Sequence, residues 1–256
     1  MSGTSERLGF RGWIEQIGQV ATLGGRFFRV LFTTRFEART FVYQVEQLGV
    51  RSMAIAGATA IFVGMVMSIQ FGFFMEKYGA KEALGKVIAI SEARELAPAL
   101  TSLVVGSRIA AGMAAELGSM SVTEQIDAIR ALGADPIRKL VVPRVMASVI
   151  IMPLIAMIAL LLGLSASCFI AANSYGISPP QFVAAALDGV TMQDYVSGLS
   201  KTPVFGFLIS ILGCHFGMST RGGTEGVGRS TTRAVVVVSI TILLADALLT
   251  QLFVSL

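Results

Sequence analysis

Five stretches of the chain are almost entirely hydrophobic, and each is long enough to cross a lipid bilayer. They cover residues 52–75, 96–117, 141–172, 196–218 and 234–256. An α-helix rises about 1.5 Å per residue, so about 20 apolar residues suffice for a hydrocarbon core of about 30 Å. The third stretch is longer and contains Pro143 and Pro153, which indicates a tilt or a break. The pattern predicts an all-α integral membrane protein in which residues 1–256 form a single membrane domain.

Small residues recur at every fourth position of the first two predicted spans. In the first span they are Ala56, Ala60, Gly64, Ser68 and Gly72, and in the second Ser102, Gly106, Ala110, Ala114 and Gly118. Such stripes let the backbones of membrane helices approach one another closely. We therefore expect both spans to pack tightly against neighbouring helices.

The N-terminal region 8–40 is amphipathic rather than continuously apolar. Between residues 8 and 32, hydrophobic side chains recur at three- and four-residue steps, with arginines and polar residues between them. Such a helix can lie in the plane of the headgroups with its arginines near anionic lipid. The alternative is a water-exposed helix that packs on a partner, and the pattern favours the interfacial helix.

A second short amphipathic helix is predicted over residues 121–132, between the second and third spans. Its apolar stripe consists of Val122, Ile126, Ile129 and Leu132. Ser121 and Glu124 fit a capping box at its start, while Gly133 and Pro136 would end it. About three helical turns are too short to span a bilayer, so we expect this helix to contact protein and water.

Charge is scarce, and its distribution predicts the orientation of the chain. Of the 256 residues 54% are hydrophobic and 14% charged, and the net charge is +4. The basic residues flank the spans, which argues against nucleic acid as a partner. Of the 20 lysines and arginines, residues 1–51 hold seven, 119–144 hold four and 219–233 hold three. Because such residues favour the cytoplasmic side, we expect a cytoplasmic N-terminus and a periplasmic C-terminus.

Two isolated charges, Arg108 and Asp246, fall near the middle of predicted spans. A charge at that depth costs about 2.5 kcal/mol or more unless it is paired or hydrated. We therefore expect the two side chains to pair, or to face one common polar interior. Such a pair could serve transport, or it could only hold two helices together.

The sequence indicates neither catalysis nor a cofactor. Gly223–Ser230 reads G-T-E-G-V-G-R-S, one residue away from a phosphate-binding P-loop, but a membrane span precedes it where a P-loop needs a strand. The single histidine, His215, and two cysteines, Cys168 and Cys214, fall short of the ligand count of a metal site. Glu92, Arg94 and Glu95 form a mixed-charge group beside Tyr78, which suits either a solvated helix end or contact with a lipid headgroup.

Four segments together with Asp246 resemble the MlaE/YrbE permeases, the membrane subunits of Mce-associated ABC transporters for lipids. The segments are E-L-A-P-A-L at Glu95–Leu100, A-A-E-L-G-S-M-S-V-T-E-Q-I-D-A-I at Ala114–Ile129, V-V-P-R at Val141–Arg144 and G-V-G-R-S-T-T-R-A-V-V at Gly226–Val236. The resemblance covers the chain from about residue 40 onward.

The resemblance implies a set of partners that the residues alone do not. It implies a homodimer in the bacterial inner membrane and a cytoplasmic ATPase that binds ATP and magnesium. An Mce-domain protein would sit on the periplasmic side, and a STAS-domain protein is an optional partner of the ATPase. The implied substrate is phospholipid or another hydrophobic lipid.

The resemblance also assigns roles to residues. The helix at 121–132 becomes a coupling helix that seats in the ATPase. Its contact residues would be Val122, Glu124, Ile126, Asp127, Ile129 and Arg130. A lipid cavity would lie at the dimer interface between the first, second and fifth spans. The positions that match it are Met67, Phe71, Phe74, Tyr78, Arg94 and Glu95.

Three other functions are alternatives to lipid transport. A secondary transporter using Arg108 and Asp246 as a proton relay would need an inverted repeat, which the five spans do not show. An intramembrane enzyme would need a catalytic set. A structural anchor for a partner complex would use the same 121–132 helix, and only loss of lipid transfer on disrupting that helix separates it from a transporter.

Overall fold

The computed structural model describes residues 10–33 and 38–255, and within them the fold is a bundle of helices without strands. The helices are α1 (Phe10–Thr33), α2 (Ala38–Lys77), the 3-10 turn η2 (Lys81–Ala83), α3 (Leu84–Ser91), the π-helical η3 (Glu92–Leu100), α4 (Thr101–Val122), α5 (Gln125–Ala131), the π-helical η4 (Ile137–Val141), α6 (Val142–Tyr175), α7 (Pro179–Gly189), α8 (Met192–Met218) and α9 (Gly223–Ser255).

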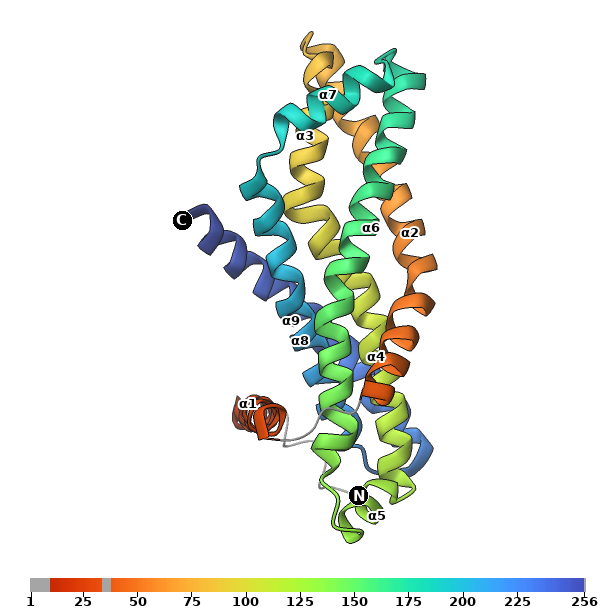
Figure 1. The fold of residues 1–256 in the computed structure, drawn as a ribbon, viewed down its shortest axis with the longest axis vertical. Coiled ribbons are helices and arrows are strands. Elements are labelled where there is room, and N and C mark those ends of the chain that lie inside the picture. The colour runs from red at the N-terminus through yellow and green to blue at the C-terminus, as the bar shows by residue number, and fades with distance from the viewer. Residues whose placement is uncertain (1–9, 34–37, 256) are drawn as a thin grey trace.

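Five continuous helical segments are long and apolar enough to cross a membrane. They are Arg39–Lys77, Lys81–Val122, Ile137–Tyr175, Met192–Met218 and Gly223–Ser255. They run alternately up and down the long axis, so that α5 lies at one end of the bundle and α3 with α7 at the other (Figure 1). We call these the α5 end and the α7 end. The expected class, an all-α membrane protein with five spans, is confirmed.

Two of the segments that connect the predicted spans, 76–95 and 219–233, are mostly helical. In residues 76–95 only residues 78–80 interrupt the helices. The balanced charges concealed an apolar face, because Leu84 and Ile88 are fully buried in a small core that includes Phe182 of α7. The Gly-rich segment 219–233 is also mostly helix, because α9 begins at Gly223.

The small-residue stripe of α2 brings this helix against α6, as expected. A Cβ atom on Gly64 would collide with the backbone of Gly163. At this contact Ser68 Oγ donates a hydrogen bond to Ser167 O (2.9 Å), and Ser167 Oγ donates to Gly64 O (2.8 Å). Because the two backbones approach closely, the serine hydroxyls of each helix can donate hydrogen bonds to backbone carbonyls of the other.

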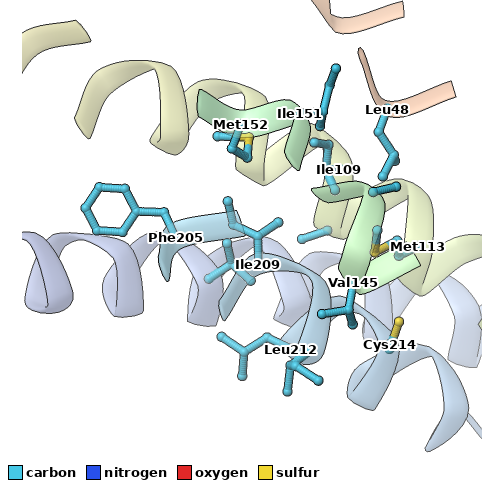
Figure 2. Close-up of a cluster of buried hydrophobic side chains, with 14 of the residues drawn as sticks. Leu48, Ile109, Met113, Val145, Ile151, Met152, Phe205, Ile209, Leu212 and Cys214 are labelled. Atoms are coloured by element: carbon cyan, nitrogen blue, oxygen red, sulfur yellow. The ribbon is translucent and has the colours of Figure 1, made fainter. Parts of the chain in front are cut away.

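The main core lies between α4, α6 and α8. Figure 2 shows Ile109 of α4 close to Ile209 of α8, with Met113, Phe205 and side chains of α6 in the same cluster. Buried Val145 and Met152 supply the contribution of α6. This core holds α4 and α8 at a fixed spacing. The polar contacts between α8 and η3, the helical segment directly before α4, depend on that spacing.

Helix α1 lies across the long axis of the bundle and is seen end-on in Figure 1. Its buried Phe27 packs against Phe207 of α8, with the ring centroids 5.8 Å apart. A helix perpendicular to the spans agrees with the interfacial helix expected over residues 8–40. Residues 8–9 and 34–37 of that expected region lie outside the described residues.

Helix α9 diverges from the bundle toward its C-terminal end (Figure 1). Several of its large apolar side chains are consequently exposed within a single chain: Val236, Ile240, Leu243, Leu244, Leu248, Leu252 and Val254. An apolar surface of this size is covered by lipid or by another protein chain.

Candidate functional site

A lysine is buried in the wall of the bundle and makes several polar contacts there. The side chain of Lys201, on α8, is 2% exposed. Its ammonium lies 2.9 Å from both carboxylate oxygens of Glu95, 2.7 Å from Thr250 Oγ1 and 3.3 Å from Asp246 Oδ1. We call Glu95, Lys201, Asp246 and Thr250 the charge cluster. It joins η3, α8 and α9 through one cation and two carboxylates, which compensate one another in a medium that would not otherwise tolerate them.

Local backbone features bring these residues together. Pro98 lies inside η3, where the helix is widened to a π-helix over Glu92–Leu100. A proline removes one backbone donor and is tolerated in membrane helices when the local winding adjusts. On α8, a Cβ atom on Gly198 would collide with the Ala93 carbonyl oxygen. Glycine at that position therefore allows α8 to approach η3 closely, and Lys201, almost one turn later, reaches Glu95.

The side chains of Glu92, Arg94 and Glu95, which were expected to form one mixed-charge group, each contact a different part of the chain. Glu92 is buried against Gly163 of α6, and Glu95 joins the charge cluster. Arg94 Nε donates to Asp194 Oδ1 at 2.5 Å. Asp194 also accepts hydrogen bonds from Thr191 N and Oγ1 at the start of α8. Arg94 thus remains partly exposed while it is tied to a helix terminus.

The expected pairing of Arg108 with Asp246 is wrong. Arg108 Nη1 donates to Ser52 Oγ of α2 at 2.6 Å, whereas Asp246 faces Lys201 of α8. Lys201 was not among the candidate residues that the sequence indicated, so its role was missed. The available signal was the same as for Arg108: an isolated charge well inside an apolar helix, here ten residues into α8.

The positions matched to a lipid cavity separate into two groups. Phe74 of α2 and Tyr78, in the turn directly after α2, are exposed; Met67 is half-buried, and Phe71 packs against the small core at the α7 end. Arg94 and Glu95 belong to the polar contacts beside α8. The structure therefore offers an exposed aromatic surface on α2 and a charged group in the same half of the bundle. Their joint lining of a lipid cavity stays a prediction.

The start of the short helix α5 differs from the expected capping box. Ser121 still belongs to α4, and its hydroxyl lies 3.2 Å from Thr220 O and 3.4 Å from Met218 O. Glu124 precedes α5 with φ 58° and makes no side-chain cap. The chain turns so sharply after α4 that Ser121 faces the turn between α8 and α9 instead. Gly133, with φ 75°, ends the segment as expected.

The apolar stripe expected to seat in the ATPase is only partly available. Ile126 is 4% exposed and packs within the chain, whereas Leu132 is 86% exposed. Asp127 and Arg130 are exposed and form an ion pair of 2.9 Å. Ile126 therefore fixes α5 to its own subunit, and a partner would meet Leu132 and the charged face.

A cavity of about 580 Å³ separates α5 from the turn between α8 and α9. Among the residues lining it are five of the six expected coupling residues and parts of the opposite turn: Val122, Glu124, Ile126, Asp127, Arg130, Ser219 and Gly222. Its walls come from two connections at the same end of the bundle. A partner bound here would contact α4, α8 and α9 at once.

The segments considered for nucleotide or metal binding have other structural roles. Gly223–Ser230 forms the first turns of α9 and follows a turn after α8, so it lacks the strand that a P-loop requires. His215 is buried with its ring centroid 5.4 Å from that of Phe216. Within residues 10–33 and 38–255, no three His, Cys, Asp or Glu side chains gather as a metal site would need.

These features define a class of protein: a multi-pass helical membrane subunit with a buried charge cluster and a partner-accessible helix at one end. The family model described as Permease MlaE matches residues 41–252. The chain belongs to this family. It is 38% identical to a probable ABC transporter permease protein of Synechocystis sp., over 98% of this chain and 96% of the relative.

Two further relatives extend the comparison. Over 91% of this chain and 67% of the relative, it is 37% identical to the chloroplastic protein TRIGALACTOSYLDIACYLGLYCEROL 1 of Arabidopsis thaliana. A probable ABC transporter permease protein of Rickettsia prowazekii is 36% identical over 83% of this chain and 82% of the relative. The chain is therefore an ABC transporter permease, a non-catalytic membrane subunit that works with a separate ATPase.

Proposed function

We propose that this permease forms the path of a phospholipid or related lipid between the bacterial inner membrane and an Mce-domain protein in the periplasm. ATP is hydrolysed by the separate ATPase. The name of the Arabidopsis relative contains that of a galactolipid, which agrees with a lipid substrate. Membership in the MlaE family supports the same substrate class.

The observation that carries this proposal is the buried charge cluster in an otherwise apolar bundle, with partly exposed Arg94 beside it. A lipid has an apolar and a polar part, and the α7-end half of the bundle offers surfaces for both. Phe73 and Phe74 expose aromatic rings on α2 that suit acyl chains. Arg94 offers a guanidinium that suits the phosphate of a headgroup.

A homodimer would cover the apolar surfaces that a single chain leaves exposed. Ile240, Leu244 and Leu248 lie four residues apart on α9 and are exposed, as are Phe73 and Phe74 of α2. We place the lipid path between two such chains, with α2, α4 and α9 at the interface. The acyl chains would then lie against apolar side chains of both subunits.

We place the α5 end in the cytoplasm, where α5 and the turn between α8 and α9 receive the ATPase. The Mce-domain protein then sits at the α7 end, and a STAS-domain protein accompanies the ATPase. Closure of two ATPases on ATP would move the two α5 helices and compress the path between the subunits. The lipid would be displaced along it.

The test is ATP-dependent lipid transfer by the purified permease–ATPase complex in proteoliposomes. A fluorescent phospholipid should move to a soluble acceptor when ATP is present, and an ATPase-inactive complex should show only background. The Arg94→Gln permease should transfer more slowly while still assembling with the ATPase. ATP hydrolysis without any lipid movement, across several lipid classes, would show that the substrate is something else.

A further inference from the structure

A second polar cavity lies between α2 and α4, in the half of the bundle that ends at α5. Its volume is about 460 Å³. Its polar and charged lining residues are Tyr43, Gln44, Gln47, Arg51, Arg108 and Glu116. Arg108 follows Glu95 by thirteen residues on a continuous helical segment, which corresponds to about 20 Å along the axis. The cavity is therefore separate from the charge cluster.

The cavity has an excess of positive charge. Arg108 donates to the hydroxyl of Ser52, and neither Arg108 nor Arg51 has a carboxylate within 4.0 Å among the described residues. The one acidic lining residue, Glu116, is already paired with the buried Arg144 at 2.8 Å. The guanidinium groups of Arg51 and Arg108 thus face a cavity whose one carboxylate, that of Glu116, is neutralised by Arg144.

An anion in this cavity would relieve an unfavourable arrangement. A guanidinium inside a membrane protein is stabilised by pairing or by water, and a hydroxyl partner supplies no charge. Guanidinium groups bind phosphate oxygens through two parallel hydrogen bonds, and the amides of Gln44 and Gln47 can donate further ones. Tyr43, whose hydroxyl accepts from Gln47 Nε2 at 2.9 Å, borders the same space.

The surroundings of the cavity favour a lipid over a free anion. On α2, Val50 and Ile55 flank the lining residues and are exposed, so apolar surface adjoins the polar cavity. Basic pockets between membrane helices on the cytoplasmic side are suited to anionic headgroups. A headgroup bound here would have its acyl chains beside the exposed aliphatic side chains of α2.

We propose that this cavity binds the phosphate headgroup of an anionic phospholipid from the leaflet at the α5 end. Arg51 and Arg108 hold the phosphate, and Gln44 and Gln47 orient it. The site lies about 20 Å along the helix axis from Glu95 of the charge cluster, and binding there requires no ATP. It can therefore act as a fixed lipid contact that stabilises the packing of α2 against α4, whatever the direction of transport.

The proposal is tested by native mass spectrometry of the purified full chain, offered phosphatidylglycerol or phosphatidylcholine with identical acyl chains. The wild type should retain phosphatidylglycerol preferentially. Arg108→Gln and Arg51→Gln should each weaken that retention about tenfold, the equivalent of one charge-assisted hydrogen-bond pair. Arg39→Gln, an exposed arginine on α2 outside the cavity, is the matched control and should behave as wild type.

Other outcomes overturn the proposal in distinguishable ways. Unchanged phosphatidylglycerol retention in the Arg51→Gln, Arg108→Gln double variant would refute the site. If millimolar inorganic phosphate displaces the bound phosphatidylglycerol completely, the ligand of the cavity is a soluble anion. Loss of the dimer, with lipid retention intact, would show that the cavity receives a second copy of the chain. If Arg108→Gln does not fold, the exposed Arg51→Gln decides the matter. Because binding is measured without ATP, failure of lipid transfer would leave this result standing.

Discussion

Lys201 shows how one side chain can determine both the packing and the chemistry of a membrane protein. Its ammonium is removed from solvent, so the two carboxylates of the charge cluster replace the stabilisation that water would provide. Glu95 and Asp246 would repel each other without it. The three helices that meet at Lys201 are therefore held in register by mutual charge compensation.

Replacing Lys201 with Met should destabilise the permease and abolish lipid transfer. The change leaves two carboxylates facing each other without a cation, and breaking such a buried group costs about 3–5 kcal/mol. Thermal unfolding of the purified chain in detergent measures the first effect and proteoliposome transfer the second. The control is Lys86→Met, because Lys86 is half exposed and lies 4.0 Å from Asp188, a pair worth about 1 kcal/mol or less. Equal stability of the two variants would contradict the role assigned to Lys201.

Sequence identified some members of this site and missed its central one. The sequence indicates Asp246 as an isolated charge within a span, and the family resemblance indicates Glu95. The partner of Asp246 could not be derived, because hydropathy places a residue by depth but leaves the rotation of its helix undetermined. Arg108 and Lys201 were both isolated basic residues in apolar helices, and only packing shows which of them reaches Asp246.

At the scale of helices, α5 separates residues that hold it in place from residues available to a partner. An apolar stripe at helical spacing is equally suited to the chain itself and to another protein. The structure assigns Ile126 to the interior and leaves Leu132 outside. The sequence predicted that a short helix lies between the second and third spans. Whether its apolar side chains face the chain itself or a partner protein depends on the turn at Thr123–Glu124, which the sequence pattern did not indicate.

Leu132→Asp should weaken association with the ATPase while leaving the permease folded. The side chain is exposed, so a charge there disturbs little within the chain but would be desolvated at an interface. Co-purification of the tagged ATPase should fall at least tenfold. Ile126→Asp is the contrasting variant: it buries a charge, so it should lower thermal stability itself. If the Leu132→Asp variant binds the ATPase as well as the wild type does, Leu132 is not part of the surface that contacts the ATPase.

The contact between α2 and α6 depends on Gly64. Gly64→Ala should destabilise the chain by about 1–3 kcal/mol, because its Cβ meets the Gly163 backbone, which cannot move aside as a flexible side chain can. Gly228→Ala is the matched control in α9, where a Cβ meets no atom within 4 Å of the described chain. That change should be neutral or stabilising by up to about 1 kcal/mol. Detergent-solubilised chains compared by thermal unfolding provide the measurement.

At the scale of the whole molecule, the number of spans was predictable but their ends were not. Hydropathy detects the apolar middle of a helix, and α2 and α9 both begin more than ten residues before it, in amphipathic or charged turns. The charged segment 76–95 and the Gly-rich segment 219–233 therefore looked like loops. Their helices are stabilised by contacts with other elements, such as α3 with α7, which no local pattern contains.

The orientation of the molecule gives the prediction with the widest consequences. Residues 1–51, 119–144 and 219–233 hold fourteen of the twenty lysines and arginines, so the end of the bundle with α5 and the turn between α8 and α9 should face the cytoplasm. In a background with Cys168→Ala and Cys214→Ala, single cysteines at Leu132 and at Leu187 report the two ends, since both side chains are exposed. A membrane-impermeant maleimide added to spheroplasts should label Leu187→Cys at once and Leu132→Cys only after permeabilisation.

The reverse labelling pattern would place α5 outside the cell, where no ATP-driven partner can act on it. Labelling of both positions from the same side would refute an odd number of crossings between α5 and α7. Either result would also relocate the arginine-lined cavity, because it occupies the α5-end half of the bundle. A single topology experiment therefore tests the premise shared by the coupling surface, the lipid path and the proposed headgroup site.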